Sequence, residues 1–224
     1  LLDNDQQKLK TYGEISRELS RRLDPDLTFE VTSDARAALT GVDYIITTIR
    51  AGGDAGRLFD EQTCLAHGVL GQETTGAGGF AMAIRSVPTL VYYCTLAREV
   101  ANPGHLIFNF TNPSGIITQA LRSKGFDNVY GICDAPSGFI KQLEEILEIP
   151  YGTLDIECYG LNHLSWFRNA KVNGRDVQRE LLDNPRTYEH SEMRLFTREM
   201  ARISGDCMLN EYLYFYYRRV KSLS

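Results

Sequence analysis

Gly131-Ile132-Cys133-Asp134-Ala135-Pro136-Ser137-Gly138 joins an apolar, strand-like run (128–132) to a helix-like run (137–147). In α/β proteins such a loop often carries the chemistry, because backbone N–H groups and the positive helix terminus face it. Cys133 and Asp134 place a thiol and a carboxyl group side by side there. A second strand-like run, 154–159, leads into Gly160-Leu161-Asn162-His163. The two loops together offer a thiolate and an imidazole.

Length and composition limit the classes of function. The chain has 224 residues, 43% of them hydrophobic and 24% charged, which is enough for a substantial core and for an enzyme. We identify no apolar run that approaches the length of a membrane span, so we expect no membrane partner. The net charge of −5 argues against nucleic acid, whose binding requires clustered Lys and Arg. The five cysteines are odd in number and widely spaced, which favours a reducing cytoplasm over a disulfide framework.

Strand-like and helix-like runs alternate along the first two thirds of the chain. A helical pattern from Leu9 to Leu23 stops before Pro25. The expected strands are 27–32, 43–49, 105–110 and 129–132, and the expected helices between them include 79–101 and 114–124. This βαβ order predicts an α/β fold with a doubly wound parallel sheet. From about residue 150 the segments become longer and more polar, so we predict one domain over 1–150 and a second over 151–224.

A glycine-rich loop precedes the longest helical run. GQETTGAGG (71–79) has four glycines in nine residues, and the helix after it carries Arg85. Glycines let a backbone approach a ligand closely, and a loop entering a helix suits an anion. A flexible surface loop and a solvated arginine are the competing interpretation. Spacing alone does not decide between them.

Other candidate residues also have a purely structural explanation. Asn112 lies in the loop NFTNPSG (109–115), where an amide commonly satisfies backbone groups. Cys133 fits an inert buried thiol, and His163 fits a hydrogen-bonded core histidine. Most rings of the tyrosine-rich run, 212–217, are expected to pack in the core. Taken singly, each of these residues favours the structural explanation.

Taken together, the stretches resemble glycoside hydrolase family 4, the NAD- and metal-dependent 6-phospho-glycosidases. The matching pieces follow the order of the family and span nearly the whole chain: DYIITTIRAGG (43–53), HGVLGQETTGAGGFAMAIRSVP (67–88), NFTNPSGIITQA (109–120), GICDAPSG (131–138), GLNHLSWF (160–167) and NEYLYFYYRR (210–219). The resemblance implies a Rossmann-like NAD-binding domain followed by part of an α+β substrate domain. It is closest to the 6-phospho-β-glucosidases.

The resemblance also implies a mechanism that differs from displacement between two carboxylates. NAD oxidises the carbon-3 hydroxyl of the sugar, a base removes the carbon-2 proton, and the glycosidic bond breaks by elimination. Water then adds and the hydride returns. A divalent metal, typically manganese, stabilises the negative charge that develops. The substrate is a small phosphorylated sugar, and the protein is expected to be a homo-oligomer, a dimer or a tetramer.

Each candidate residue receives a role from its match to the family. Cys133 and His163 hold the metal, Asp134 protonates the leaving oxygen, and Tyr212 is the best-aligned catalytic base, with Tyr214, Tyr216 and Tyr217 as the alternatives. Arg85 meets the 6-phosphate, Asn112 and Asn162 contact the sugar, and Asp3, Thr48 and Asn109 contact NAD.

The sequence also departs from the family. The first strand of the family and its glycine-rich turn precede Leu1, so Asp3 is expected to end the second strand and meet the adenosine ribose. The chain stops soon after Tyr217, within the substrate domain. Asp134 stands where many β-specific members have Asn, which leaves the anomeric preference open.

Other functions remain alternatives at this point. A 6-phospho-α-glucosidase or α-galactosidase of the same family is one of them. A 2-hydroxy-acid dehydrogenase would use His163 but leave Cys133 unexplained. A truncated, non-catalytic nucleotide-binding module is a further alternative. A metal requirement separates the glycosidases of this family from the dehydrogenase. Measuring NAD binding tests the non-catalytic nucleotide-binding module.

Overall fold

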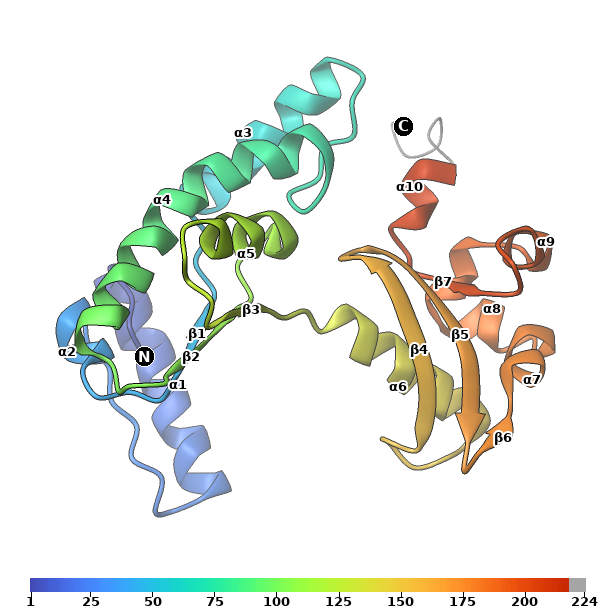
Figure 1. Ribbon diagram of the computed structural model, residues 1–224, viewed down its shortest axis with the longest axis horizontal. Helices are drawn as coiled ribbons and strands as arrows, with labels where there is room; N and C mark the ends of the chain where they lie inside the picture. Colours follow the sequence, from blue (N-terminus) through green and yellow to red (C-terminus); the bar gives the residue numbers. More distant parts are fainter. Residues whose placement is uncertain (218–224) are drawn as a thin grey trace.

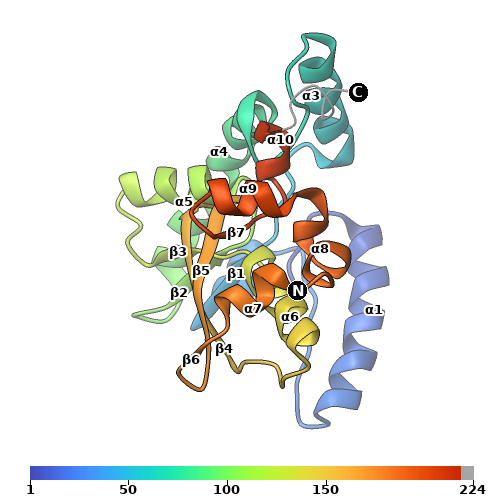
Figure 2. The same cartoon turned by 90° about the vertical axis from the view of Figure 1, so that its right-hand side faces the viewer.

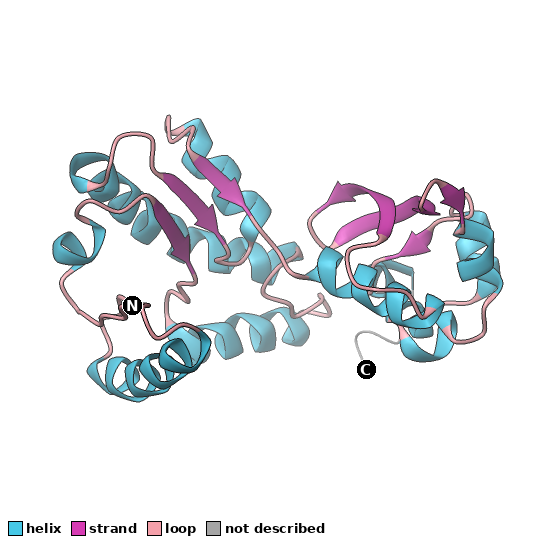
Figure 3. Ribbon diagram, turned by 90° about the horizontal axis from the view of Figure 1, so that it is seen from below, coloured by secondary structure: helices cyan, strands magenta, loops and turns pink. Residues whose placement is uncertain are grey.

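The computed structural model describes residues 1–217, which form two lobes (Figure 1). Each lobe has its own apolar core, one ending at Val129 and the other beginning at Phe139. The chain passes between them once within these residues, through the loop that follows strand β3 (Figure 3). The octapeptide around Cys133 therefore joins the two lobes.

The first lobe is an α/β unit with a parallel sheet. Its elements in chain order are α1 (Gln6–Leu23), α2 (Ala35–Leu39), β1 (Tyr44–Thr47), α3 (Gly53–Ala66), α4 (Gly76–Val100), β2 (Leu106–Asn109), α5 (Ser114–Ser123) and β3 (Val129–Gly131). The strands lie in the order β1-β2-β3, all parallel, with Thr47 opposite Asn109 and Asn109 opposite Gly131. The expected strand over 27–32 is reduced to a single parallel bridge between Leu2 and Thr32.

The two faces of this sheet differ. Ile107 and Val129 are buried in the core beside Ile117 and Leu121 of α5. On the other face, the rings of Tyr44, Phe108 and Tyr130 form a row, with centroids 6.4 Å and 6.3 Å apart. Tyr44 is 70% exposed and Ile46 is 66% exposed. Strands of a parallel sheet are usually buried on both faces, whereas β1 is covered on one face only within the described residues.

Helix α1 begins and ends as its sequence predicts. The Asp5 side chain accepts hydrogen bonds from the N–H groups of Gln7 and Lys8, and two arginines stand in the last turn. Its apolar stripe is largely exposed, however. Leu9 is buried, whereas Leu19 is 52% and Leu23 is 83% exposed. Helical spacing identified the helix correctly but did not identify a packed face.

Helix α4 is the long helix of the first lobe. It contacts α2, α3 and α5, and it buries Leu90, Cys94 and Ala97. By length and composition α4 reaches the threshold for a helix that crosses a membrane, with a mean hydropathy of 1.2 and 39% of its most apolar window buried. Core helices of soluble proteins pass the same test. The sequence analysis expected no apolar run of this length, and that expectation was wrong. Arg85 and Pro88 make the run look interrupted in the sequence.

The second lobe is built on an antiparallel hairpin. Its elements are α6 (Ala135–Leu147), β4 (Leu154–Leu161), β5 (Leu164–Val172), β6 (Arg175–Asp176), α7 (Gln178–Asp183), α8 (Thr187–His190), the 3₁₀ helix η1 (Glu192–Leu195), α9 (Arg198–Ile203), β7 (Met208–Leu209) and α10 (Leu213–Tyr217). Strand β5 pairs with β4, β6 and β7, and the hairpin of β4 and β5 is visible in Figure 2.

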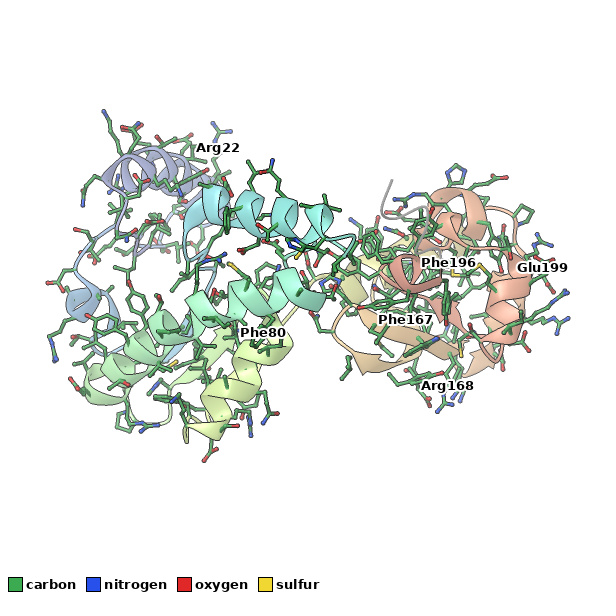
Figure 4. The ribbon with its side chains drawn as sticks, turned by 90° about the horizontal axis from the view of Figure 1, so that it is seen from above. Arg22, Phe80, Phe167, Arg168, Phe196 and Glu199 are labelled. Atoms are coloured by element: carbon green, nitrogen blue, oxygen red, sulfur yellow. The ribbon has the colours of Figure 1, made fainter. Side chains whose placement is uncertain are left out.

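Helix α6 packs into the second core rather than the first. The Phe139 ring meets the Phe167 ring edge to face at 4.9 Å, and both are fully buried. Phe167 lies inside the lobe while its neighbour Arg168 points outward (Figure 4), as alternation along a strand requires. The boundary expected at residue 150 follows α6, whereas the two cores separate before it.

The tyrosine-rich end is less buried than expected. Leu213 is 1% exposed and belongs to the second core, but Tyr216 is 50% exposed and Tyr217 is 44% exposed. Because α10 has only five residues, it turns one side toward the core. The rest of the NEYLYFYYRR motif, Arg218 and Arg219, lies outside the described residues.

Candidate active site

The candidate site lies at the carboxyl edge of the parallel sheet. The chain leaves β1 at Thr48, β2 at Phe110 and β3 at Ile132, all on the same edge. The hairpin tip of the second lobe and the loop before α10 reach the same place. Ligands of open α/β sheets bind beyond the carboxyl ends of the strands.

Cys133 and His163 meet at this edge. The Cys133 Sγ atom lies 3.5 Å from the His163 Nε2 atom. Cys133 comes from the loop between β3 and α6, and His163 from the two-residue tip of the β4–β5 hairpin, where Leu161 pairs with Leu164. His163 adopts a left-handed backbone with φ +59°. At Gly160 (φ +119°) a Cβ atom would come within 2.3 Å of the Leu164 carbonyl oxygen, so the tight hairpin requires glycine there.

The environment of Cys133 favours its thiolate. Burial by itself would raise the pKa of the thiol, but hydrogen bonds from His163, the Ala135 backbone N–H and Asn162 outweigh it, so the pKa of Cys133 is lowered. The buried Nδ1 of His163 and Oδ1 of Asn162 have no hydrogen-bond partner among the described residues. Buried polar atoms of this kind call for a partner.

Tyr212 packs directly on this pair. Its ring stacks on the His163 imidazole with centroids 4.1 Å apart and an angle of 22° between the planes. The Gln72 side-chain amide donates to the Tyr212 hydroxyl oxygen at 2.9 Å, which connects the glycine-rich loop of the first lobe to the second lobe. Burial raises the pKa of Tyr212, although a hydrogen bond with Thr74 opposes the shift.

A buried carboxyl group fixes the segment that carries Tyr212. One oxygen of Glu192 accepts from the Asn210 side-chain amide at 3.2 Å and from the Glu211 N–H at 2.9 Å. The Asn210 side-chain oxygen in turn accepts from the Tyr212 N–H, and the backbone N–H of Asn210 donates to the Ser165 carbonyl oxygen. Tyr212 is thus tied to the strand that begins just after His163.

Charged residues of the first lobe gather on the neighbouring loops. Glu73 is 8% exposed and pairs with Arg50; its other oxygen lies 3.5 Å from Arg57 and accepts from the Asn112 amide at 3.4 Å. Arg57 also interacts electrostatically with Tyr212. Asn112 is thereby placed beside the cluster.

The remaining candidates occupy different surroundings. Asp134 is exposed at the start of α6, next to Cys133. Thr48 is exposed at the end of β1. Asp3 follows the Leu2–Thr32 bridge, and its side chain accepts from the Asp5 N–H. Asn109 is fully buried and its side chain binds Thr47, Thr111, Ser114 and Thr118, so it holds the β2–α5 loop rather than offering an amide to a ligand.

Arg85 is held by partners within the first lobe. Its guanidinium forms a bidentate ion pair with Asp60 of α3, and its Nε donates to the Ala51 carbonyl oxygen at 3.3 Å. Asp60 is 7% exposed. A Cβ atom at Gly52 would lie 3.1 Å from the Arg85 Nε, so the glycine at this position of the β1–α3 loop makes room for this side chain. Arg85 therefore joins α3 to α4 in this structure.

The sequence analysis overlooked Gln72, Glu73, Arg50 and Arg57. Arg50, Gln72 and Glu73 lie within stretches that the resemblance matched and Arg57 lies between two of them, yet none was given a role. An apolar strand followed within three residues by Arg50, and a Glu73 inside a glycine-rich loop, are signals of functional charge. They became interpretable only when the fold brought the two loops together.

Cys133 and His163 fit a catalytic metal site. Among residues 1–217 no group of three or more His, Cys, Asp or Glu side chains could hold a metal. Two protein ligands leave coordination positions open, which suits a metal that must also meet a substrate. The soft thiol and the imidazole are common ligands of divalent transition metals.

The fold and this geometry define an α/β protein whose parallel sheet presents a thiol–imidazole pair and a tyrosine at its carboxyl edge. The chain belongs to family 4 of the glycosyl hydrolases: the family model matches residues 1–149, and the model of the C-terminal domain of that family matches residues 158–223. The gap between the two matches contains residue 150, where the sequence analysis places its boundary.

Relatives of both anomeric types are similar to the chain. A 6-phospho-β-glucosidase of Thermotoga maritima is 36% identical over 184 residues, which cover 81% of this chain and 43% of the relative. A 6-phospho-α-glucosidase of Lacticaseibacillus paracasei is 32% identical over 178 residues, covering 78% and 40%. The chain therefore spans less than half the length of these relatives.

A solved structure of a relative has the same fold. The 6-phospho-β-glucosidase of Thermotoga maritima with manganese, NAD⁺ and glucose 6-phosphate matches with a TM-score of 0.84 and 32% identity, over 99% of this chain and 52% of that one. The parallel sheet, the hairpin and the lobe arrangement described above are thus those of the family.

Proposed function

We propose that the protein hydrolyses 6-phospho-glucosides of the β type with NAD and a divalent metal, the 6-phospho-α-glucosides being the alternative substrates. The proposal rests on one observation: Cys133 Sγ lies 3.5 Å from His163 Nε2, and Tyr212 stacks on the same imidazole. Family membership and the ligands of the Thermotoga maritima structure support it. The five cysteines are all unpaired thiols, which suits the cytoplasm.

Named residues would hold the two groups. Cys133 and His163 are the metal ligands, and Asp3 and Thr48 are the contacts for NAD. When bound, NAD supplies a hydride acceptor for carbon 3 of the sugar, and the metal supplies positive charge beside the carbon-3 oxygen. Asn162 and Asn112 supply amides that orient the sugar hydroxyls.

Two protons move during the reaction. Tyr212 removes the proton from carbon 2, and the Gln72 amide holds its oxygen in place. The phenolate form requires nearby positive charge, because burial raises the pKa of Tyr212, and Arg57 is one such charge. Asp134, beside Cys133 and open to solvent, gives a proton to the leaving oxygen and recovers one from water.

The substrate phosphate needs a cation. Arg85 is our candidate, and its bidentate pair with Asp60 keeps two of its donors occupied. Arg57 and Arg50, which share the Glu73 carboxylate close to Asn112, are the further cations at this site. Bidentate guanidinium groups are well suited to phosphate.

Turnover in deuterated water tests the proposal. The chain is supplied with NAD, MnCl₂ and nitrophenyl 6-phospho-β-glucoside, and the α anomer in parallel. We expect glucose 6-phosphate that carries deuterium at carbon 2, because the proton leaves to Tyr212 and returns from solvent. Tyr212→Phe should reduce turnover and carbon-2 exchange by roughly 10²- to 10⁴-fold while NAD still binds.

Three results would contradict parts of this proposal. Product without solvent deuterium would exclude elimination. Exchange that survives in Tyr212→Phe would move the base to one of the tyrosines of α10. Faster turnover of the α anomer would assign the chain to the other substrate class.

A further inference from the structure

Asn210 links the segment that carries the proposed base to the strand that follows the proposed metal ligand. It is 1% exposed and lies between strand β7 and Tyr212. Its backbone N–H donates to the carbonyl oxygen of Ser165 at 3.1 Å, and Ser165 stands two positions after His163 in the chain. The backbone at Asn210 therefore fixes the segment of Tyr212 to the hairpin that carries His163.

The side chain of Asn210 continues this link in two directions. Its Oδ1 atom accepts from the backbone N–H of Tyr212 at 3.2 Å, and its Nδ2 atom donates to the carboxyl group of Glu192 at 3.2 Å. One orientation of the amide suits both partners, because a turned amide would point its own N–H groups at the N–H of Tyr212. The buried amide thus defines the position of the chain that follows it.

Glu192 supports this amide from the other side. The oxygen that accepts from Asn210 also accepts from the backbone N–H of Glu211 at 2.9 Å. The backbone N–H of Glu192 donates to the side chain of Gln142 in α6 at 3.0 Å. The consecutive backbone N–H groups of Glu211 and Tyr212 are thus both held by buried side chains that precede them in the chain.

The ring of Tyr212 is the part of the site that this support affects. It stacks on His163 with 4.1 Å between the ring centroids, and Gln72 of the other lobe donates to its hydroxyl oxygen. The contact at the hydroxyl sets the direction of the phenol, whereas the backbone from which the ring extends sets its distance from the imidazole. A shift of about 1 Å in a reacting group can lower a rate by about 100-fold.

We propose that Asn210, oriented by Glu192, is a positioning residue of the reaction: it holds Tyr212 at the distance from the imidazole at which the phenol can take the proton from carbon 2. The inference rests on the proposed function and adds to it two buried residues that act through Tyr212. The segment can fold without them, since Leu213 is packed in the second core, but its ring is then no longer fixed.

Two variants remove the support from its two ends. Glu192→Met and Asn210→Leu each replace a polar side chain by an apolar one of similar size, which fills the same space. Glu144→Met is the matched control. Glu144 is 2% exposed and one of its oxygens likewise accepts two backbone N–H groups, those of Thr153 and Leu154, but at the start of β4, away from the hairpin tip.

The experiment measures kcat with NAD and MnCl₂ on the nitrophenyl 6-phospho-glucoside of the preferred anomer, with hydrogen or with deuterium at carbon 2. Calorimetry gives the affinity for glucose 6-phosphate. The fluorescence of Trp166, whose backbone pairs with Leu209 next to Asn210, measures the folded fraction of each variant. Trp166 is the single tryptophan of the chain, so its signal reports this place.

The isotope effect distinguishes positioning from folding. Glu192→Met and Asn210→Leu should lower kcat about tenfold to 100-fold per folded molecule and raise the isotope effect, because removal of the carbon-2 proton becomes the slow step. Affinity for glucose 6-phosphate should stay within about threefold. Glu144→Met should leave both kcat per folded molecule and the isotope effect unchanged. Glu192→Gln should stay within about threefold of the parent chain, because an amide oxygen still accepts both hydrogen bonds.

A fall in kcat that merely follows the loss of folded protein, with an unchanged isotope effect, would overturn the inference and leave Asn210 and Glu192 as structural residues. An isotope effect raised equally by Glu144→Met would do the same. Should Asn210→Leu fail to fold, Glu192→Met decides the question, because it leaves the Asn210 amide in place. If the parent chain turns over neither anomer, the proposed function itself fails and the inference falls with it.

Discussion

Glu192 holds the segment that carries Tyr212, and its burial removes the carboxyl group from water. Its side chain is almost fully buried, and burial raises the pKa of its carboxyl group to about 7, although the Glu211 N–H opposes the shift. Glu211 also raises this pKa through repulsion, whereas His163 and Arg194 lower it. A carboxyl group that keeps its proton near neutrality in the folded chain releases it on unfolding, so Glu192 makes stability depend on pH.

Glu192→Gln should remove this pH dependence. The ordinary pKa of the group is 4.5 and the folded value is about 7, so wild-type stability relative to the variant falls as pH rises through this interval and is constant above it. The full difference is roughly 3 kcal/mol. Denaturant unfolding of both proteins from pH 4.5 to pH 8 measures it. Parallel pH profiles for the two proteins would exclude a raised pKa at Glu192.

The ion pair of Arg85 and Asp60 connects two helices of the first lobe. It joins α4 to α3 beside the glycines of the β1–α3 loop, and Asp60 is largely shielded from water. A buried carboxylate that loses its partner lowers the free energy of unfolding by several kcal/mol, whereas removing both partners lowers it much less. Loss of substrate affinity in an Arg85 variant would therefore mix a binding effect with a folding effect.

Arg85→Ala should destabilise the chain by about 3 kcal/mol, because it leaves the Asp60 carboxylate buried and unpaired. The double variant Asp60→Ala/Arg85→Ala should recover a large part of that loss. Urea unfolding of the wild type, both single variants and the double variant gives the coupling energy. Additive losses would contradict a strong pair. If the double variant is stable yet still discriminates against unphosphorylated substrate, the phosphate contact belongs to Arg57 or Arg50.

The helices and strands show how far the sequence could predict the fold. The parallel order and the bounds of α1, α4, β2 and α6 were predicted closely, because apolar spacing, Pro25 and the capping residues are local signals. Helix α3 was missed, since it begins at Gly53 directly after a glycine in a left-handed conformation. The strand expected over 27–32 shrank to one bridge, because pairing depends on a partner strand that local pattern does not reveal.

The candidate site was predictable for the same kind of reason, and only in part. Cys133 and His163 follow strand-like runs, so their meeting follows from topology once both runs are strands. Gln72 contacts Tyr212 across 140 positions of sequence, and Glu73 meets Asn112 across 39. The first contact arises from how the two lobes close on each other, and the second from how two loops of the first lobe meet; periodicity within a single element specifies neither.

At the scale of the whole molecule, the site is complete only when the lobes are together. Gln72, Glu73 and Asn112 belong to the first lobe, whereas His163 and Tyr212 belong to the second. Each lobe has its own core, so each can in principle unfold separately. A ligand that binds only the assembled site couples their stabilities.

Calorimetric scans should show this coupling. Without ligands we expect two overlapping thermal transitions, one for each core. Saturating glucose 6-phosphate with NAD and MnCl₂ should raise both transition temperatures and bring them closer together. A ligand at 100 times its Kd adds about 2.7 kcal/mol to the free energy of unfolding. Unphosphorylated glucose serves as the control. A shift confined to one transition would place the ligand within a single lobe.

The single crossing between the lobes within residues 1–217 also bears on which contacts depend on closure. Cys133 sits in that crossing, so it is close to the pivot of any rotation of one lobe against the other. Displacement grows with distance from a pivot, so the thiol of Cys133 moves little in such a rotation. The hydrogen bond between the Gln72 amide and the Tyr212 hydroxyl joins opposite lobes, so any opening of the lobes stretches it.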